Sequence, residues 1–204
     1  QRYADTPPGD LWDELKNVMR SDMFALSALD IAAYDLDAKR NNQKVWQGWG
    51  LEWNSVPQSS YTIGIDRIET MVGKLSEKPD WGSYKIKLGT PKDIEIVTEL
   101  RKHTDAVFRV DANCGWGVDE TVENAMKLAE LGVEFIEQPQ PNDVSPDAKK
   151  RVYQQSVLPI VADEDCQVMS DVASCAEAFH GVNVKLCKCG GLSSAIRMLT
   201  EAKS

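Results

Sequence analysis

The sequence has 204 residues, of which 42% are hydrophobic and 27% charged, and this composition is ordinary for a soluble globular protein. Its net charge of −9 argues against nucleic acid or an anionic membrane as a partner. No apolar stretch approaches the roughly 20 residues that a membrane-spanning helix needs. Five cysteines without a disulfide-like spacing favour reduced thiols, so a cytoplasmic protein is predicted.

The first 60 residues have the pattern of helices without strands. Apolar residues between Leu11 and Met19 recur at helical spacing. A second, apolar-rich helix is predicted to begin after Ser21, its N-cap, and to continue through Leu36. From residue 61 onward the pattern changes to alternating strands and helices. We therefore predict two domains, 1–60 and 61–204.

Six short apolar runs alternate with helical patterns in the second region, as in a parallel sheet built from βα units. These predicted strands are 61–65, 83–88, 107–111, 133–137, 158–163 and 182–185. Polar groups at the ends of five of the six runs favour a (β/α) barrel of the TIM type over an open doubly wound sheet. We therefore predict an α/β fold, a (β/α) barrel truncated to about six strands.

Two helix starts in this region carry capping patterns. Asp66 is followed three residues later by Glu69, which is typical of a capping box. Thr90-Pro91 has the pattern of an N-cap followed by proline at the first helical position. A further helix is predicted around residues 146–155.

Three acidic residues each close one of the apolar runs: Asp111, Glu137 and Asp163. They are spaced 26 residues apart in both intervals, about the length of one strand, one helix and their loops. On neighbouring parallel strands the three would lie side by side at one end of the sheet. Clustered carboxylates repel one another unless a cation lies between them, and Mg²⁺ is the simplest such cation. A single acid of this kind is usually a helix cap or a solvated residue, but three in phase favour a metal site.

Lysines bracket the three acids at a similar spacing. Lys85 lies 26 residues before Asp111, and Lys185 lies 22 residues after Asp163. Lys87 shares a strand face with Lys85, because residues i and i+2 of a strand point to the same side. The order along the sheet is then a lysine pair, three acids and a third lysine. This pattern predicts a metal ion with amine groups on both sides.

Five short motifs occur in order: K-x-K at 85–87, D-A-N at 111–113, E-Q-P at 137–139, D-E at 163–164 and N-x-K-x-x-K-x-G-G at 183–191. Together with the helical stretch 28–36, they resemble the enolase superfamily, and within it the muconate-lactonising-enzyme-like subgroup. The strand at 61–66 and the region around Lys185 look most similar to dipeptide epimerases of the L-Ala-D/L-Glu type.

The resemblance implies an isomerase: a Mg²⁺-dependent epimerase that removes the proton α to the carboxylate of a dipeptide and passes through an enediolate. The three acids would hold Mg²⁺, with Mn²⁺ as the alternative. Lys87 and Lys185 would act as bases on opposite faces of the substrate, and the ammonium of Lys85 beside Lys87 favours the neutral amine that a base needs. Three further motif residues are expected to orient the ligands or the base: Asn113, Glu164 and Lys188.

Two alternatives stay open. The chain resembles other enzymes of the subgroup as well, such as o-succinylbenzoate synthase or a muconate-type cycloisomerase. It also fits a truncated, non-catalytic chain that keeps the metal-binding core, because the family's cap-domain sheet and last two strands have no counterpart here. Residues 1–60 would then be the helical part of a capping domain. An unclosed barrel has exposed sheet edges, so we expect a homo-oligomer. The ligand that the resemblance implies is a small carboxylate, a dipeptide.

Overall fold

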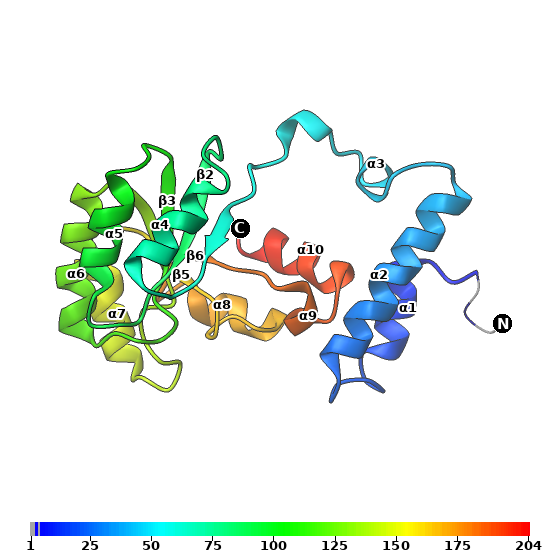
Figure 1. Ribbon diagram of the computed structural model, residues 1–204. Helices are drawn as coiled ribbons and strands as arrows, with labels where there is room; N and C mark the ends of the chain where they lie inside the picture. The colour runs from blue at the N-terminus through cyan, green and yellow to red at the C-terminus, as the bar shows by residue number, and fades with distance from the viewer. Residues whose placement is uncertain (1–2, 4) are drawn as a thin grey trace. The chain divides into compact units, whose positions relative to one another are not determined.

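The computed structural model describes residue 3 and residues 5–204 (Figure 1). Two compact units make up the described chain. The first, called here the sheet unit, comprises Gln58–Asp165 and Ser174–Asn183. The second, called here the helical unit, comprises Gln1–Pro57, Cys166–Ala173 and Val184–Ser204. The predicted division into domains 1–60 and 61–204 stays a prediction.

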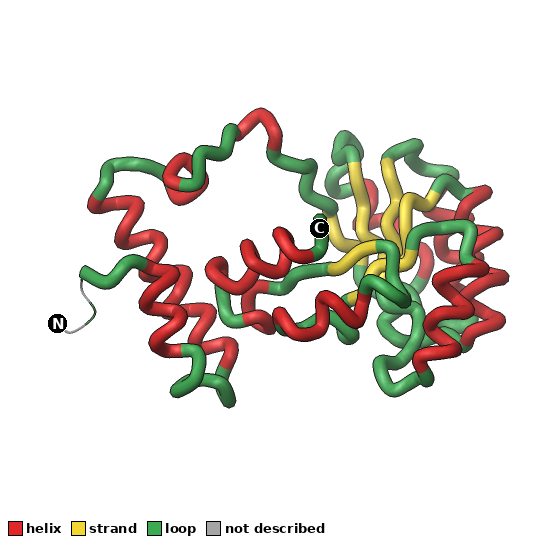
Figure 2. The backbone as a smooth tube through the Cα atoms, turned by 180° about the vertical axis from the view of Figure 1, so that it is seen from behind, coloured by secondary structure: helices red, strands yellow, loops and turns green. Residues whose placement is uncertain are grey.

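Six parallel strands form the centre of the sheet unit and pair in chain order (Figures 1 and 2). The strands are β1 (Tyr61–Ile63), β2 (Ser83–Lys87), β3 (Val107–Asp111), β4 (Val133–Glu137), β5 (Ile160–Ala162) and β6 (Gly181–Val182). Because every strand pairs in parallel with the next strand of the chain, each connection must cross back over the sheet. This topology confirms the predicted α/β fold with six parallel strands.

Helices make the crossover connections, and the first four of them pack beside one another on the sheet (Figure 2). They are α4 (Ile68–Ser76), α5 (Asp93–Arg101), α6 (Val118–Glu130), α7 (Pro146–Gln155) and the short α8 (Val172–Cys175). Alternate residues of the central strands face this layer, and those of β2 and β3 have no exposed surface: Tyr84, Ile86, Phe108 and Val110. The intervening residues face the other side of the sheet, where the polar groups gather.

Several predicted element boundaries agree with the structure. Strands 107–111 and 133–137 and the helix over 146–155 have the predicted limits. The outer strands are shorter than predicted, and β6 ends at Val182. Lys185 therefore lies outside the strand, as the residue that precedes the single-turn helix α9 (Leu186–Cys189).

The two helix starts predicted from capping patterns, at Asp66 and Thr90, are wrong. The Asp66 carboxylate accepts a hydrogen bond from the neighbouring Arg67 amide (2.6 Å), and α4 begins only at Ile68. Helix α5 begins at Asp93 rather than at Thr90. The reason is the buried Asp93 carboxylate, which accepts hydrogen bonds from the amides of Gly89 and Thr90 (both 2.9 Å). It thereby satisfies the donors of the turn that the sequence pattern assigned to the helix.

The helical unit contains the two helices predicted before residue 60, packed with two helices from the end of the chain. Its helices are α1 (Pro8–Leu15), α2 (Met23–Arg40), α3 (Val45–Gly48), α9 and α10 (Leu192–Glu201), with 3-10 turns η1 (Trp53–Ser55) and η2 (Met169–Asp171). Asp22, rather than Ser21, caps α2 and accepts a hydrogen bond from the Ala25 amide (2.9 Å). Within the described residues, none of the helices has the length and apolar character required to cross a membrane.

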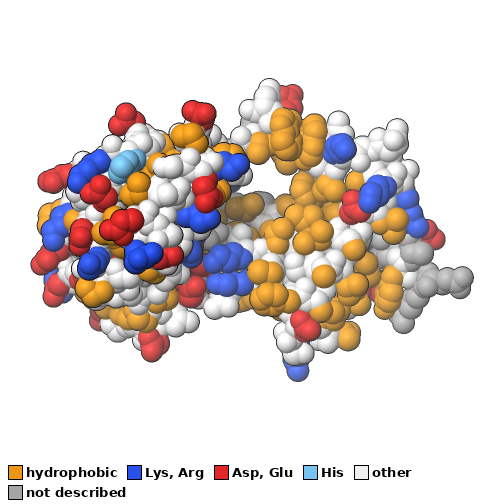
Figure 3. Space-filling view, in the orientation of Figure 1, with side chains coloured by type: hydrophobic (Ala, Val, Ile, Leu, Met, Phe, Trp, Pro, Cys, Tyr) orange, Lys and Arg blue, Asp and Glu red, His pale blue; other side chains and the backbone are white. Residues whose placement is uncertain are grey.

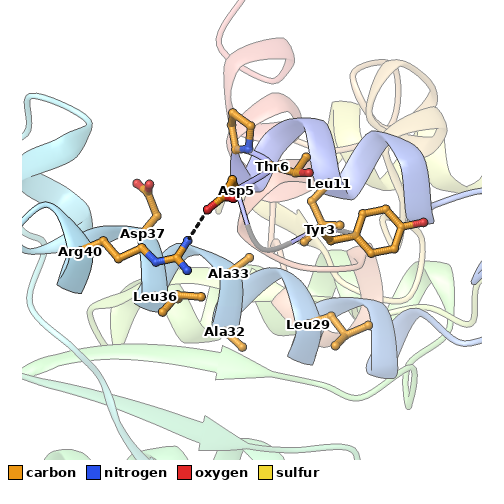
Figure 4. A pocket seen from close by; sticks show the side chains of 11 residues that line it. Tyr3, Asp5, Thr6, Leu11, Leu29, Ala32, Ala33, Leu36, Asp37 and Arg40 are labelled. Carbon is orange, nitrogen blue, oxygen red and sulfur yellow. Dashed lines mark ion pairs between the residues drawn. The ribbon is translucent and has the colours of Figure 1, made fainter. Parts of the chain in front are cut away.

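The surface of the helical unit carries many hydrophobic side chains (Figure 3). Exposed apolar residues of this unit include Val18, Phe24, Leu29, Leu36, Leu51 and Trp53. One outer face of α2 and the segment before α1 line a groove of about 360 Å³ (Figure 4). Its walls include Leu29 and Leu36, and the Arg40 guanidinium lies 3.7 Å from the Asp5 carboxylate at its edge.

The loops that follow β2 and β3 touch each other at two glycines. A Cβ atom on Gly115 would lie 2.7 Å from the Gly89 Cα atom and 2.9 Å from the Ala112 carbonyl oxygen. Gly89 itself has a φ of +113°, a conformation that favours glycine. This contact lets the two strand ends that carry Lys87 and Asp111 lie close together.

We expect Gly115→Ala to lower the free energy of unfolding by about 1–3 kcal/mol, because the added methyl group meets backbone atoms on both sides. The matched control is Gly73→Ala, at an exposed position inside α4 where an added Cβ meets nothing within 4 Å. The control substitution is expected to raise stability by about 0.5–1 kcal/mol. Chemical denaturation of the three proteins measures both effects, and equal stability of the two variants would contradict the close approach of the loops.

Candidate functional site

Three carboxylates meet at the carboxyl ends of neighbouring strands. Asp111 is the last residue of β3, Glu137 is the last residue of β4, and Asp163 directly follows β5. Asp111 and Glu137 are paired in the sheet register. One oxygen from each of the three side chains lies within 4.8 Å of the others, and all three residues are buried. The structure thus brings together the three acids that the 26-residue spacing predicted as neighbours.

Two lysines of β2 place their ammonium groups against this cluster. The Lys85 Nζ atom lies 2.6 Å from Glu137 Oε2 and 3.0 Å from Asp111 Oδ2. The Lys87 Nζ atom lies 2.6 Å from Asp111 Oδ2. Lys85 therefore bridges two strands, whereas Lys87 pairs with the acid of its neighbouring strand alone.

The opposing charges shift the protonation equilibria of the cluster. Burial alone would raise the pKa of Asp111, but the ammonium groups of Lys87 and Lys85 outweigh it and hold this pKa below its usual value. The pKa of Glu137 is raised by burial and by the nearby charge of Asp111. Burial would lower the pKa of Lys85, but Glu137 and Asp111 raise it above its usual value. Lys85 is therefore a fixed positive charge between two acids.

Gln138 orients the third acid, although the sequence analysis assigned it no role. Its side chain is fully buried, and its Oε1 atom accepts hydrogen bonds from the Asp163 amide (2.8 Å) and the Asp165 amide (3.3 Å). Its Nε2 group donates to the Gln140 carbonyl (2.8 Å) and to Asp165 Oδ2 (2.6 Å). Gln138 thus ties the end of β4 to the loop after β5 and fixes the backbone that carries Asp163.

Asn183, the first residue of the motif at 183–191, also contacts the cluster. Its Nδ2 group donates a hydrogen bond to Glu137 Oε1 (2.7 Å). Because Lys85 occupies the other oxygen of Glu137, both oxygens of this carboxylate have a partner. The side-chain amide of Asn183 therefore fixes the rotamer of Glu137.

The predicted supporting residues lie in different places. The Asn113 backbone amide donates to Asp111 Oδ1 (3.0 Å), and Asn113 has a positive φ of 48°. Glu164 Oε2 lies 3.8 Å from the Cys114 thiol. Lys188 is in the last turn of α9, in the helical unit with Lys185.

The donor set of the cluster suits a hard divalent cation. All three groups offer carboxylate oxygens, the ligands that Mg²⁺ prefers. Burial and the charge of Glu164 raise the pKa of the nearby Cys114 thiol to about 11, and its soft sulfur is a poor ligand for Mg²⁺. The cluster already attracts cations, as the two ammonium groups show. Asp111, Glu137 and Asp163 therefore fit a Mg²⁺ ion.

A family model described as enolase C-terminal domain-like matches residues 70–204, which is more than half of the chain. The chain belongs to this family. Its six-stranded parallel sheet corresponds to the C-terminal (β/α)-barrel portion of enolase superfamily members, so the predicted superfamily and fold class are confirmed.

Relatives with named activities resemble nearly the whole chain. The L-Ala-D/L-amino acid epimerase of Flavobacterium johnsoniae is 53% identical over 196 residues, which are 96% of this chain and 58% of that protein. A structure of a dipeptide epimerase from Enterococcus faecalis, complexed with Mg and the dipeptide L-Leu-L-Tyr, is 30% identical with a TM-score of 0.87. That match covers 97% of this chain and 58% of that one. The muconate lactonizing enzyme structure gives a TM-score of 0.86 at 25% identity, over 98% of this chain and 58% of that one.

These matches confirm the predicted resemblance to dipeptide epimerases within the enolase superfamily. The chain of 204 residues spans little more than half the length of the relatives that it matches. The predicted homo-oligomer and the predicted cytoplasmic location stay predictions.

We expect the substitution Asp163→Asn to abolish Mg²⁺ binding, because it removes one of three charged oxygen ligands from the cluster. Isothermal titration of the unsubstituted chain and of this variant with MgCl₂ measures the effect. Asp147→Asn, in the first turn of α7, is the control and is expected to bind Mg²⁺ like the unsubstituted chain. Unchanged affinity in Asp163→Asn, and also in Asp111→Asn and Glu137→Gln, would contradict the assignment of the site.

The substitution Lys85→Met tests the role of the bridging ammonium. Without metal, it leaves Asp111 and Glu137 close together with one cation fewer, so we expect the free energy of unfolding to fall by roughly 3 kcal/mol. Saturating Mg²⁺ is expected to restore more stability to the variant than it adds to the unsubstituted chain. The control Lys102→Met breaks an exposed ion pair with Glu99 and is expected to cost less than about 1 kcal/mol. If Mg²⁺ raised the free energy of unfolding by the same amount in all three proteins, this result would argue against competition between Lys85 and the metal.

Proposed function

We propose that this chain is the metal-binding and proton-transferring part of a dipeptide epimerase. The observation that carries the proposal is the cluster of three buried carboxylates with two lysines of the adjacent strand against it. The relative that is 53% identical, an L-Ala-D/L-amino acid epimerase, supports a dipeptide as the substrate. Epimerisation of such a substrate removes the proton from a carbon next to a carboxylate and delivers another proton to the opposite face of that carbon.

The central difficulty of this reaction is the weak acidity of the carbon. Negative charge develops on the substrate carboxylate as the proton leaves, and it must be stabilised as it forms. Asp111, Glu137 and Asp163 would hold a Mg²⁺ ion, which would supply the positive charge for this stabilisation. Lys85 adds a second positive charge from beside Glu137 and Asp111, and these two carboxylates keep it protonated.

Lys87 is the proposed base on one face of the substrate. It lies at the carboxyl end of β2, where its Nζ atom is held 2.6 Å from Asp111 Oδ2. The amine therefore approaches the same point as the metal ligands. In the neutral form it accepts the α-proton of one antipode, and in the charged form it donates a proton when the other antipode reacts.

Lys185 is the proposed base on the opposite face. It lies two residues after Asn183, whose side chain donates a hydrogen bond to the metal ligand Glu137 (2.7 Å). In the sequence, Lys185 therefore follows directly on the segment that contacts the carboxylate cluster. Two bases explain an epimerisation, whereas a cycloisomerisation or elimination of the subgroup needs one essential lysine.

The two-base proposal is tested by exchange at the α-carbon in D₂O. We expect Lys185→Ala to abolish conversion between L-Ala-L-Glu and L-Ala-D-Glu, with a loss of about 10²-fold or more. The variant should still exchange the α-proton of one antipode with solvent, and Lys87→Ala should still exchange the other. The control is Lys127→Ala, on the exposed side of α6, which is expected to leave both rates unchanged.

Nuclear magnetic resonance of each antipode separately measures these rates. If one lysine variant loses exchange from both antipodes and the other variant loses exchange from neither, the enzyme would have a single base. If the unsubstituted chain exchanges the α-proton of neither antipode, this result would contradict the proposed function itself.

A further inference from the structure

A tight turn in the helical unit links α9 to α10, and two residues far away in the sequence hold it. The turn consists of Gly190 and Gly191, with φ values of +88° and +116°. The indole Nε1 group of Trp12, in α1, donates a buried hydrogen bond to the Gly190 carbonyl oxygen (2.7 Å). This hydrogen bond ties the turn to the first helix of the chain.

Asp30, in the middle of α2, holds the other end of the turn. Its carboxylate accepts hydrogen bonds from the Ser193 amide (2.9 Å) and the Ser193 hydroxyl (2.7 Å). Ser193 lies in the first turn of α10, where free amide groups and the helix dipole favour a negative charge. Asp30 has only 3% of its surface exposed, so these interactions are protected from water.

The fit between the turn and the two helices leaves no room for side chains. A Cβ atom on Gly191 would lie 2.5 Å from Asp30 Oδ2, and one on Gly190 would lie 3.1 Å from a Leu26 methyl group. Helices α2 and α9 pack directly against each other. The turn is therefore fixed by shape as well as by hydrogen bonds.

The turn is connected rigidly to Lys185. The Lys185 carbonyl oxygen accepts hydrogen bonds from the amides of Lys188 (2.9 Å) and Cys189 (3.0 Å). The Leu186 carbonyl oxygen accepts from the amides of Gly190 (3.1 Å) and Gly191 (2.9 Å). A displacement of the glycine turn is thus passed through the single turn of α9 to the backbone of Lys185.

We propose that Asp30 is a positioning residue for Lys185, acting through the Gly190–Gly191 turn, with Trp12 as its counterpart on the other side. The proposal rests on the proposed function, in which Lys185 is one of two bases. Lys87 stands on β2 in the sheet unit, where neither Asp30 nor Trp12 is among its hydrogen-bond or ion-pair partners. Loss of the Asp30 contacts is therefore expected to impair one of the two proton transfers selectively.

The substitution Asp30→Asn tests this selectivity. It keeps the shape of the side chain but removes its charge and replaces one acceptor oxygen by an NH₂ donor, so the side chain no longer accepts from both the amide and the hydroxyl of Ser193. We expect exchange in D₂O from the Lys185-dependent antipode, defined as the one lost in Lys185→Ala, to fall at least about tenfold. Exchange from the Lys87-dependent antipode should change less than about twofold. A loss of global structure would instead lower both rates together.

Two further variants make the test independent of a folding defect. Trp12→Phe removes the Nε1 donor to Gly190 together with part of the ring that packs beside the turn, and should cause a smaller loss on the same antipode. The matched control Asp35→Asn removes an exposed acid of the same helix, paired with Lys39 at 2.6 Å, and should change neither rate. Equal losses for both antipodes in Asp30→Asn and Trp12→Phe, or no loss in either variant, would overturn the proposal.

Amide hydrogen exchange separates this inference from the proposed function. In Asp30→Asn, the amides of Lys188, Cys189, Gly190 and Gly191 should exchange faster with solvent, while those of β2 to β4 keep their protection. If the unsubstituted chain exchanges neither antipode, the proposed function fails, and these amide rates alone decide whether Asp30 holds the Lys185 segment. Unchanged amide rates in this segment would overturn the positioning role in either case.

Discussion

The Lys85 ammonium between Glu137 and Asp111, 2.6 and 3.0 Å from their oxygens, is the interaction on which the site depends. A parallel sheet brings the carboxyl ends of its strands to one edge, so three acids that end neighbouring strands must lie together. Buried carboxylates at this distance repel one another strongly unless positive charge lies between them. Lysines supply that charge in the structure, and a divalent cation fits the same oxygens. We therefore expect a divalent cation to take over part of the charge balance that the lysines provide.

Two kinds of support keep the reactive groups in place. In the sheet unit, Gln138 accepts a hydrogen bond from the Asp163 backbone amide and Asn183 donates one to the Glu137 carboxylate, so they hold two of the three proposed metal ligands. In the helical unit, Asp30 and Trp12 hold the turn that follows Lys185. A proton transfer is sensitive to small displacements of the base, so residues that touch no substrate still affect its rate. The two proposed bases thus have separate supports, one in each unit.

Local patterns in the sequence were sufficient for much of this fold. The spacing of Asp111 and Glu137 gave correct limits for β3 and β4, because apolar runs and their polar ends repeat with the length of a βα unit. The predicted start of α5 was wrong because the Asp93 carboxylate accepts hydrogen bonds from the preceding amides. The spacing of apolar residues does not reveal such a contact. The Asp30–Ser193 contact joins residues 163 positions apart, and only tertiary packing brings them together. Partners at such distances leave no mark in a single sequence.

A crystal structure of the chain grown with MgCl₂ tests the central claim most directly. The account predicts one Mg²⁺ ion bound by Asp111, Glu137 and Asp163 at about 2.0–2.1 Å, with waters completing an octahedron. It also predicts that the Lys85 ammonium withdraws from at least one of its two carboxylates, because the metal takes over their charge. Lys85 still bridging Glu137 and Asp111 at saturating Mg²⁺, with no ion among the three acids, would contradict it.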